Sequence, residues 1–365
     1  MRGYGMSGKQ KRIAFYYNSA FEGDSVETVP LGGMKKATIH MARELSKLGN
    51  AVSVFCDCKK EGLFTGVRYL NLRNMKDHLA NDPADIFISE GESQIFMHSL
   101  NSRINVLFSG LNPDQRVVIG KDAIKKIDHY FFVSRWQAEQ TIKKFRLDKN
   151  KVFITRNGYD PAFLADGIER IKYRMIYFSS PARGLDILVE IFPKIKKRFS
   201  SAELFVFSDY EFYGKPKGEG EKRYPEIYKK MDQPGIRSLG NIKHAELMRQ
   251  LQMSYLMAYP TRFHETSCMA AIEAQAAGTP PVTSRIAALP ETIEHSKTGV
   301  LIPGNPRTLL YKWRYLRAIF DLFEDEAKWQ AMSEAGKKRM NEDFTWGKIA
   351  VEWDSFFDTI LKRTI

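Results

Sequence analysis

The chain has little cysteine and no long apolar run. Its 365 residues include three cysteines, Cys56, Cys58 and Cys268, which are too few for a disulfide framework and predict a reducing, cytoplasmic setting. Cys56 and Cys58 have no second ligand pair near them in the sequence, so we expect no zinc site there. No apolar run is long enough to cross a bilayer, and no apolar core follows the basic segment 1–12. We therefore expect neither a membrane span nor a signal peptide.

Acidic residues are outnumbered by basic ones. The chain has 56 Lys and Arg against 43 Asp and Glu, a net charge of +13, which favours anionic partners. It has neither zinc-finger spacing nor the aromatic motif of RNA-binding modules, so nucleic acid is not expected as a partner. An anionic surface at the inner membrane face stays a candidate partner. A protein that only binds such a surface stays an alternative function.

Apolar runs and helical periodicities alternate along the chain. Its 43% hydrophobic and 27% charged residues are typical of a folded globular protein, and its length predicts two domains. Short apolar runs typical of buried parallel strands occur at 12–17, 51–56, 84–89, 104–108, 129–134 and 151–158, with helical patterns at 34–48 and 136–145. The pattern restarts with strands at 174–180, 202–208 and 254–260 and helices at 185–199 and 245–252. Between them, residues 209–234 are expected to form a long surface excursion with some helix.

This alternation predicts an α/β fold of two doubly wound, Rossmann-like domains that face each other across a cleft. The first domain is expected at residues 1–165 and the second at 166–344. Ligands of such sheets bind at the carboxyl ends of the strands, so the loops that follow the strands are where we look for a site.

One such loop, within residues 259–278, carries two glutamates, Glu265 and Glu273. It follows the strand expected at 254–260, and a helix is expected from about 268 to 277, capped by Thr266 or Ser267 and closed by Gly278. Backbone amides at the start of that helix, together with its dipole, suit a diphosphate. Two solvated glutamates on a surface helix are the plainer interpretation, but the strand, cap and helix context favours a binding site.

The same segment resembles the signature of retaining glycosyltransferases of family four, which have the GT-B fold. The shared features are two glutamates eight positions apart, the run Gly278-Thr279-Pro280-Pro281-Val282, and the stretches 289–293 and 298–302. The run Ser179-Ser180-Pro181-Ala182-Arg183-Gly184 resembles a variant of the family with Ser-Ser-Pro-x-Arg-Gly. Residues 134–163 resemble the stretch that closes the family's first domain, and Leu31-Gly32-Gly33 resembles its glycine loop.

This resemblance implies a hexosyl-type transferase that uses a nucleotide sugar as co-substrate, with no cofactor and no metal. In catalysis, Glu265 would contact the donor sugar near the reacting carbon, and Arg183 would neutralise the diphosphate. Glu273 would bind the ribose hydroxyls. The other residues implied in nucleotide-sugar binding are Gly32, Gly33, Thr266, Ser267, Cys268, Met269 and Lys243. The first domain would be the acceptor side, and the helix at 345–365 would pack back on it.

The same resemblance favours UDP over GDP as the donor nucleotide, because UDP is the more frequent one in the family. The chain has no Asp-x-Asp motif, which agrees with metal-independent transfer. The acceptor is left open as a hydroxyl of a glycan, a lipid-linked molecule or another compound, as in polysaccharide biosynthesis.

One departure from the variant occurs at Phe108-Ser109-Gly110, where its members often have Trp-x-His. Gly110 would then stand in place of a histidine that orients the donor sugar. His98 and Asn112 are candidates to replace it. A non-catalytic relative that binds nucleotides or carbohydrates is the alternative that this departure leaves open.

Overall fold

The computed structural model describes residues 10–114, 118–211 and 214–363. They form two compact units. The first contains the described residues up to Val26, then Gly33–Gly158, and those from Trp346 on; the second contains Glu27–Gly32 and Tyr159–Thr345. The chain thus leaves the first unit at Gly158, a few residues before the boundary expected at 165. The first nine residues, which include part of the basic segment 1–12, lie outside the described part of the chain.

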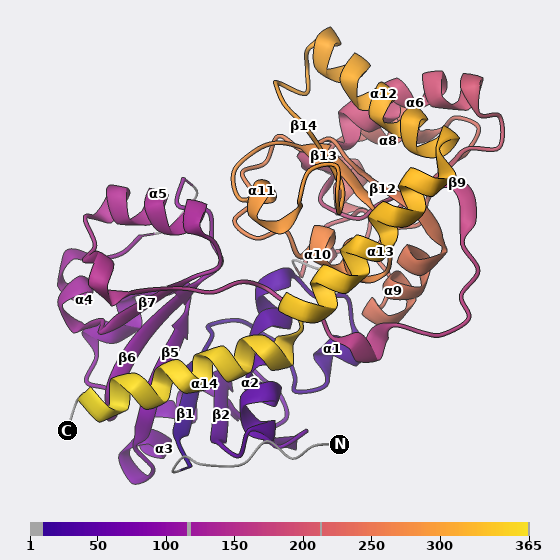
Figure 1. Cartoon of the computed structure of the whole chain (residues 1–365). Coiled ribbons are helices and arrows are strands. Elements are labelled where there is room, and N and C mark those ends of the chain that lie inside the picture. The colour runs from indigo at the N-terminus through magenta and orange to yellow at the C-terminus, as the bar shows by residue number, and fades with distance from the viewer. Residues whose placement is uncertain (1–9, 115–117, 212–213, 364–365) are drawn as a thin grey trace. The chain divides into compact units, whose positions relative to one another are not determined.

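The first unit is built on an eight-stranded sheet in the order β3-β4-β2-β1-β5-β6-β7-β8 (Figure 1). Its strands are β1 (Arg12–Tyr16), β2 (Ala51–Cys56), β3 (Gly62–Phe64), β4 (Val67–Asn71), β5 (Ala84–Glu90), β6 (Ser102–Ser109), β7 (His129–Phe132) and β8 (Val152–Ile154). Every pairing is parallel except that of β3 with β4. The six strands predicted in this half are therefore confirmed, and the β3–β4 hairpin is an addition.

The helices of the first unit are α2 (Gly33–Lys47), α3 (Met75–Asn81), α4 (Lys121–Lys126), α5 (Arg135–Phe145) and α14 (Trp346–Arg363). The short α1 (Ser25–Thr28) has its first two residues in the first unit and its last two in the second. In α2 the residues Ala37, Met41 and Leu45 are buried at helical spacing. Gly49 follows α2 with φ 90°, and its N–H donates to the Ser46 carbonyl, as expected for a glycine that ends a helix.

The second unit has a six-stranded parallel sheet in the order β11-β10-β9-β12-β13-β14. The strands are β9 (Ile171–Tyr177), β10 (Glu203–Val206), β11 (Ile236–Ser238), β12 (Ser254–Tyr259), β13 (Pro281–Ser284) and β14 (Val300–Ile302). Its helices are α6 (Leu185–Arg198), α7 (Glu219–Arg223), α8 (Pro225–Met231), α9 (His244–Met253), α10 (Met269–Ala276), α11 (Leu289–Thr292), α12 (Leu309–Glu324) and α13 (Glu326–Asp343). Two parallel sheets with crossing helices confirm the predicted α/β class with two Rossmann-like domains.

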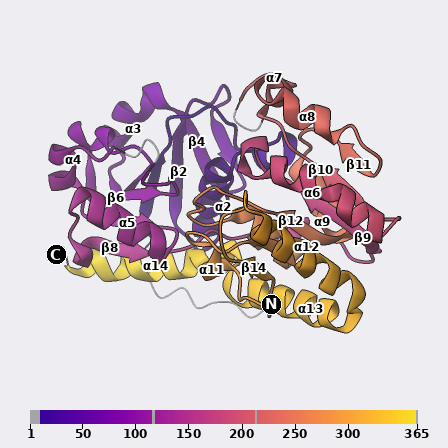
Figure 2. The same cartoon turned by 90° about the horizontal axis from the view of Figure 1, so that it is seen from above.

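The excursion predicted at 209–234 contains α7 and α8, which lie next to each other in Figure 2. Its anchor is Asp209, a buried residue whose carboxylate accepts from the backbone N–H groups of Tyr210, Gly218 and Gly220 at 2.7, 2.8 and 2.8 Å. One carboxylate thus accepts hydrogen bonds from three backbone amides of the loop. These bonds fix the start of residues 209–234 next to β10.

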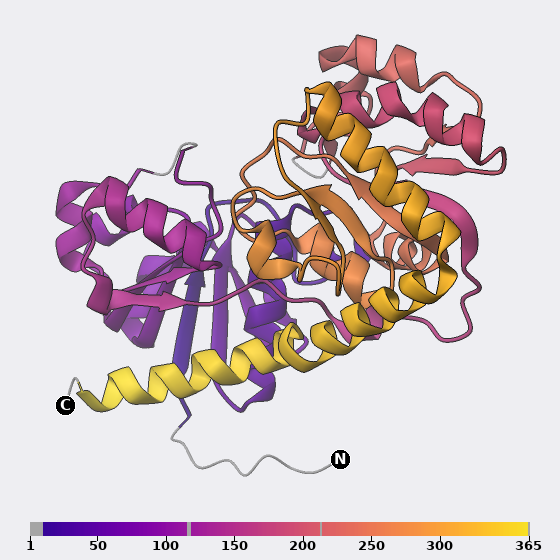
Figure 3. The ribbon, with the colours of Figure 1, turned by 45° about the horizontal axis from the view of Figure 1, so that its top comes forward.

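Helix α14 belongs to the first unit and follows α13 along the chain (Figure 3). Its Trp353 is fully buried, with ring centroids 5.0 Å from Phe108 of β6 and 4.8 Å from Phe131 of β7. The indole N–H donates to Thr155 Oγ1 at 2.7 Å, so the polar group of this large side chain is satisfied. In the described part of the chain, no helix is both long and apolar enough to span a bilayer.

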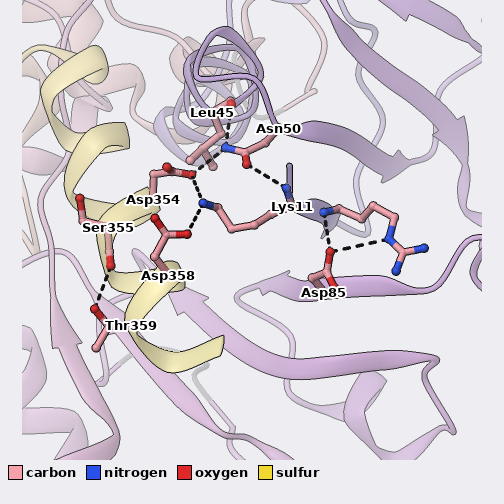
Figure 4. A network of polar contacts seen from close by, with 9 residues as sticks. Lys11, Leu45, Asn50, Asp85, Asp354, Ser355, Asp358 and Thr359 are labelled. Carbon is pink, nitrogen blue, oxygen red and sulfur yellow. Dashed lines mark hydrogen bonds and ion pairs between the residues drawn. The ribbon is translucent and has the colours of Figure 1, made fainter. Parts of the chain in front are cut away.

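A buried lysine ties α14 to the start of β1. The Nζ of Lys11 lies 3.1 Å from Asp354 Oδ1 and 2.6 Å from Asp358 Oδ1, and the Lys11 side chain is only 6% exposed. Asn50 completes the network, since its amide donates to Asp354 at 2.7 Å and its Oδ1 accepts from the Lys11 backbone N–H at 3.3 Å (Figure 4). A buried ammonium needs such partners, because removing it from water is costly.

Replacing both Asp354 and Asp358 by Asn should lower the free energy of unfolding by about 3 kcal/mol, because Lys11 would stay buried without a counter-charge. Urea unfolding followed by tryptophan fluorescence would measure this. As a control, Asp122→Asn breaks an ion pair of similar length to Lys125 that is 77% and 68% exposed, and should cost less than about 1 kcal/mol. Equal effects of the two changes would contradict this account of Lys11.

Candidate functional site

The carboxyl ends of β9 and β12, which are neighbours in the second sheet, bring Arg183 and Glu265 together. Arg183 lies in the short 3-10 turn Pro181–Arg183 after β9, and Glu265 lies in the loop after β12. Arg183 Nη1 is 3.0 Å from Glu265 Oε1, and the Arg183 guanidinium carbon is 3.7 Å from the centre of the Phe263 ring. Two predicted site residues from distant stretches of the chain therefore form one ion pair stacked on an aromatic ring.

Tyr259, the last residue of β12, supports Glu265 from the protein interior. Its hydroxyl donates to Glu265 Oε1 at 2.5 Å and lies 3.3 Å from Ser179 Oγ. Burial, followed by the negative charge of Glu265, raises the pKa of Tyr259 well above its ordinary value, so the hydroxyl keeps its proton and acts as a donor. The same carboxylate oxygen thus accepts from both Tyr259 and Arg183. Sequence reasoning missed Tyr259, although its place at the end of an apolar run at a strand terminus could have indicated it.

Helix α10 begins slightly later than predicted, and its predicted cap was wrong. Cys268 is the N-cap residue, its side chain makes no cap hydrogen bond, and the first helical residue is Met269. Thr266 and Ser267 are buried in the loop before the cap, because that loop turns inward with Glu265 instead of starting the helix. Gly278 follows the helix with φ 71°, and its N–H donates to the Gln275 carbonyl, as predicted.

Glu273 lies in α10 and is 3% exposed, so it is not a solvated surface glutamate. Its Oε1 lies 3.7 Å from Nε2 of His244, the first residue of α9. The His244 ring in turn meets Phe163 edge-on, with 4.7 Å between ring centroids. His244 was not predicted from the sequence, whereas its neighbour Lys243 was. Lys243 is the exposed N-cap residue of α9.

A second ion pair stands near the first. Arg262 Nη1 lies 2.7 Å from Asp186 Oδ2, and Asp186 is in the first turn of α6. Arg262 follows β12 and Asp186 follows β9, so the same two strand ends carry both ion pairs. The edge therefore holds two arginines, each next to a carboxylate that an incoming anion would have to replace.

The other candidates from the sequence lie in the first unit, except Gly32, which is the last residue of the segment Glu27–Gly32 that belongs to the second unit. Gly33 is the first residue of α2 and Gly32 precedes it. Gly110 directly follows β6, and Asn112 is buried just beyond it. His98 is an exposed residue with extended backbone that follows the 3-10 turn Gln94–Met97.

Side chains that could bind a metal do not cluster among the described residues of either unit. Over residues 10–114, 118–211 and 214–363, no group of three or more His, Cys, Asp or Glu side chains could hold a metal ion. Cys56, Cys58 and Cys268 are free and buried. Burial raises the pKa of the Cys268 thiol well above its ordinary value, so this cysteine is not a reactive thiolate.

Solved structures share this architecture. Sucrose-phosphate synthase from Thermosynechococcus elongatus matches 97% of this chain and 100% of that chain with a TM-score of 0.74 and 14% identity. Anabaena Alr3699/HepE, solved in complex with UDP-glucose, matches 96% of this chain and 100% of that chain with a TM-score of 0.71 and 13% identity. At such low identities the likeness shows the fold, which is that of GT-B glycosyltransferases.

Residues 174–317 match the family described as "Glycosyl transferases group 1", and this segment contains Arg183, Glu265 and Glu273. The glycogen synthase of Mycobacterium tuberculosis is 33% identical over 114 residues, which are 31% of this chain and 26% of that protein. The chain therefore spans about a quarter of the length of this relative. These matches support the resemblance to group 1 glycosyltransferases for the second unit.

Gly184 sets the position of Arg183, and replacing it by Ala should be strongly destabilising. Gly184 has φ 106°, and a Cβ there would lie 2.2 Å from the Pro260 carbonyl oxygen and 2.7 Å from its carbon. Gly167→Ala is the matched control, because Gly167 also has positive φ, 70°, but a Cβ there would meet nothing within 4 Å. The control should cost about 1–2 kcal/mol of unfolding free energy. Thermal unfolding would rank the two variants, and a Gly184→Ala variant as stable as the control would contradict this role.

Proposed function

We propose that this chain is a retaining glycosyltransferase that moves a sugar from a nucleotide sugar to an acceptor hydroxyl without a metal. The observation that carries the proposal is the Arg183–Glu265–Tyr259 cluster at the ends of β9 and β12, inside the segment that matches group 1 glycosyl transferases. Sugar transfer builds positive charge on the sugar and negative charge on the departing diphosphate. Arg183 and Glu265 lie side by side and can stabilise both charges: the arginine the negative diphosphate, and the carboxylate the positive sugar.

In this proposal Arg183 exchanges partners. A donor diphosphate carries more negative charge than one carboxylate and offers the guanidinium paired oxygens, so it can draw Arg183 away from Glu265. Phe263 and the turn before Gly184 keep the guanidinium in place during this exchange. Tyr259 still donates to Glu265, so the carboxylate that faces the sugar keeps one hydrogen bond when Arg183 leaves.

Glu273 and the start of α10 would hold the nucleotide. The buried Glu273 carboxylate can accept from vicinal ribose hydroxyls, and His244 at 3.7 Å supports it from α9. The backbone at Cys268 and Met269, together with Thr266 and Ser267, brings the positive end of the helix dipole toward a phosphate. Lys243 would lie on the nucleobase side, and Gly32 and Gly33 would allow close approach of the backbone to the phosphates.

We infer a UDP-sugar donor rather than a GDP-sugar, with Alr3699/HepE, crystallised with UDP-glucose, as support from the fold. The acceptor would be a hydroxyl of a glycan or a lipid-linked molecule, and the first unit would carry it. The free cysteines support a cytoplasmic setting. The net charge of +13 supports contact with an anionic inner membrane face.

Glu273→Ala should weaken nucleotide binding while the protein stays folded. We expect UDP-sugars to raise the unfolding temperature of the wild-type protein in a panel of UDP- and GDP-sugars, and to raise it far less in the variant, because the ribose loses its carboxylate partner. The exposed carboxylate of Glu334 on α13 offers a control, since Glu334→Ala should leave the ligand-induced shift unchanged. If no nucleotide or nucleotide sugar shifts the wild-type protein, the proposed function is wrong.

Arg183→Ala and Tyr259→Phe should reduce turnover more than stability. We expect kcat to fall by about 100-fold in the arginine variant, the loss typical of one preorganised charge-stabilising donor. Tyr259→Phe should lower kcat by about tenfold with little change in KM for the donor, because Tyr259 acts only through Glu265. Steady-state kinetics with the best donor would measure both. A rise in KM alone for Tyr259→Phe would argue against its positioning role.

A further inference from the structure

The first unit contains a carboxyl group that its own fold does not satisfy. Glu90 is the last residue of β5, is 3% exposed, and pairs in register with Phe108 of β6. Neither of its carboxyl oxygens has a hydrogen-bond partner among the residues that the structure describes. Its backbone sits at the carboxyl end of a parallel sheet, where ligands of doubly wound folds bind.

The polar groups around Glu90 do not neutralise it. The Thr38 hydroxyl is nearby but donates to the Met34 carbonyl at 3.1 Å, so its proton is already used. The backbone N–H of Gly110 and the Thr38 hydroxyl both act to lower the pKa of Glu90, but by less than burial raises it. Burial raises the pKa of Glu90 well above its usual range, which favours the neutral carboxylic acid, the form that has a proton to donate. Tyr17 lies close enough for Glu90 to raise its pKa in turn, after burial.

The buried carboxyl group of Glu90 does not stabilise the fold. A buried carboxyl group without a partner costs free energy that an apolar side chain of similar size would not, so packing alone gives no reason for a glutamate at this position. Buried unsatisfied polar groups are rare in native proteins and call for a specific explanation. A carboxylic acid held neutral in an apolar site, ready to donate a hydrogen bond to a substrate, is one known use of this arrangement.

Two glycines, Gly91 and Gly110, lie beside Glu90, with the Met34 side chain against both and the Leu111 side chain against Gly91. Gly91 has φ 71°, and Gly110 follows β6 on the neighbouring strand. A Cβ at Gly110 would be 3.7 Å from Met34 Cγ, and one at Gly91 would be 3.3 Å from Met34 Cε, so the half-buried Met34 side chain lies against both. Methionine changes rotamer easily, and no side chain at 91 or 110 would obstruct a ligand that displaces it.

We propose that Glu90 is a substrate-binding residue that donates a hydrogen bond to a hydroxyl group of a sugar bound at this edge, after Met34 moves aside. This proposal rests on the proposed transferase function. It gives the first unit a polar side chain beside Gly110, where the related variants have a histidine. The proton stays on Glu90 and no bond is made or broken there. The hydroxyl belongs to the donor sugar or to the acceptor, and the experiment separates these sources.

The test uses the full chain with Glu90→Met and Glu90→Gln. Methionine fills the same space without a polar group, so Glu90→Met should raise the unfolding temperature and yet lower kcat/KM for transfer by tenfold or more. The amide of glutamine keeps a donor, so Glu90→Gln should retain transfer to within about threefold. Asp85→Asn, at the amino end of the same strand, is the control and should leave kcat/KM unchanged. Opposite signs for stability and activity cannot come from a purely structural role.

Hydrolysis of the nucleotide sugar without acceptor separates the two sources of the hydroxyl. Loss of both hydrolysis and transfer in Glu90→Met assigns the hydroxyl to the donor sugar, and loss of transfer alone assigns it to the acceptor. If Glu90→Met does not fold, Glu90→Ala takes its place in the activity comparison. A Glu90→Met or Glu90→Ala variant that transfers as fast as wild type overturns the proposal, as does a Glu90→Gln variant as impaired as either. A wild-type protein with no transfer or hydrolysis at all overturns the proposed function instead.

Discussion

The contact between Arg183 and Glu265 organises the edge of the second sheet. Glu265 is almost fully buried, so its carboxylate must have donors, and they come from two strand ends: Arg183 after β9 and Tyr259 at the end of β12. Gly184 lets the turn after β9 pass against the Pro260 carbonyl, which brings the two loops close enough for the pair to form. Without the ion pair, the loops after β9 and β12 would each carry a charge that the other no longer balances.

Arg183 is more exposed to solvent than Glu265, and this difference decides which of the two an incoming ligand reaches first. The Arg183 side chain is 25% exposed and the Glu265 side chain 9%, so an anion from solvent can reach the guanidinium more easily than a cation can reach the carboxylate. An incoming anion would therefore separate the ion pair by binding Arg183. Tyr259 remains behind Glu265, which limits the cost of opening because the buried carboxylate keeps one donor.

The two units treat their edge carboxyl groups in opposite ways. Glu265 accepts hydrogen bonds from two side chains, whereas Glu90 has none from the described residues. Glu265 is held by two side-chain donors, whereas burial raises the pKa of Glu90 well above its usual range. Different surroundings are a recurring way in which a protein gives two carboxyl groups different tasks at one pH.

Much of the fold was readable from the sequence because parallel strands are buried on both faces and appear as short apolar runs, such as RIAFY in β1. Short-range features were less reliable: the β3–β4 hairpin was not predicted, and the α10 cap was assigned to Thr266 or Ser267 instead of Cys268. Arg183, Glu265 and Glu273 are candidates that a motif indicated, and geometry added Tyr259 and His244 to the candidates.

Contacts between residues far apart in the chain were beyond sequence reasoning. Lys11 and Asp358 are 347 positions apart, and nothing in either stretch indicates the other. Glu90 is a similar case, because glutamates are ordinarily exposed and nothing in the sequence around it indicates that it is buried.

The pairing of Lys11 with α14 also has a consequence for synthesis. The second unit is nearly continuous in sequence, whereas the first needs residues from both sides of it. On the ribosome the second unit can finish folding while Lys11 and the face of the sheet that receives Trp353 still wait for α14. Amino-terminal domains usually complete folding first during synthesis. In this chain the amino-terminal unit completes folding last. Until α14 has been made, the first unit lacks the helix whose Trp353 packs on Phe108 of β6 and Phe131 of β7.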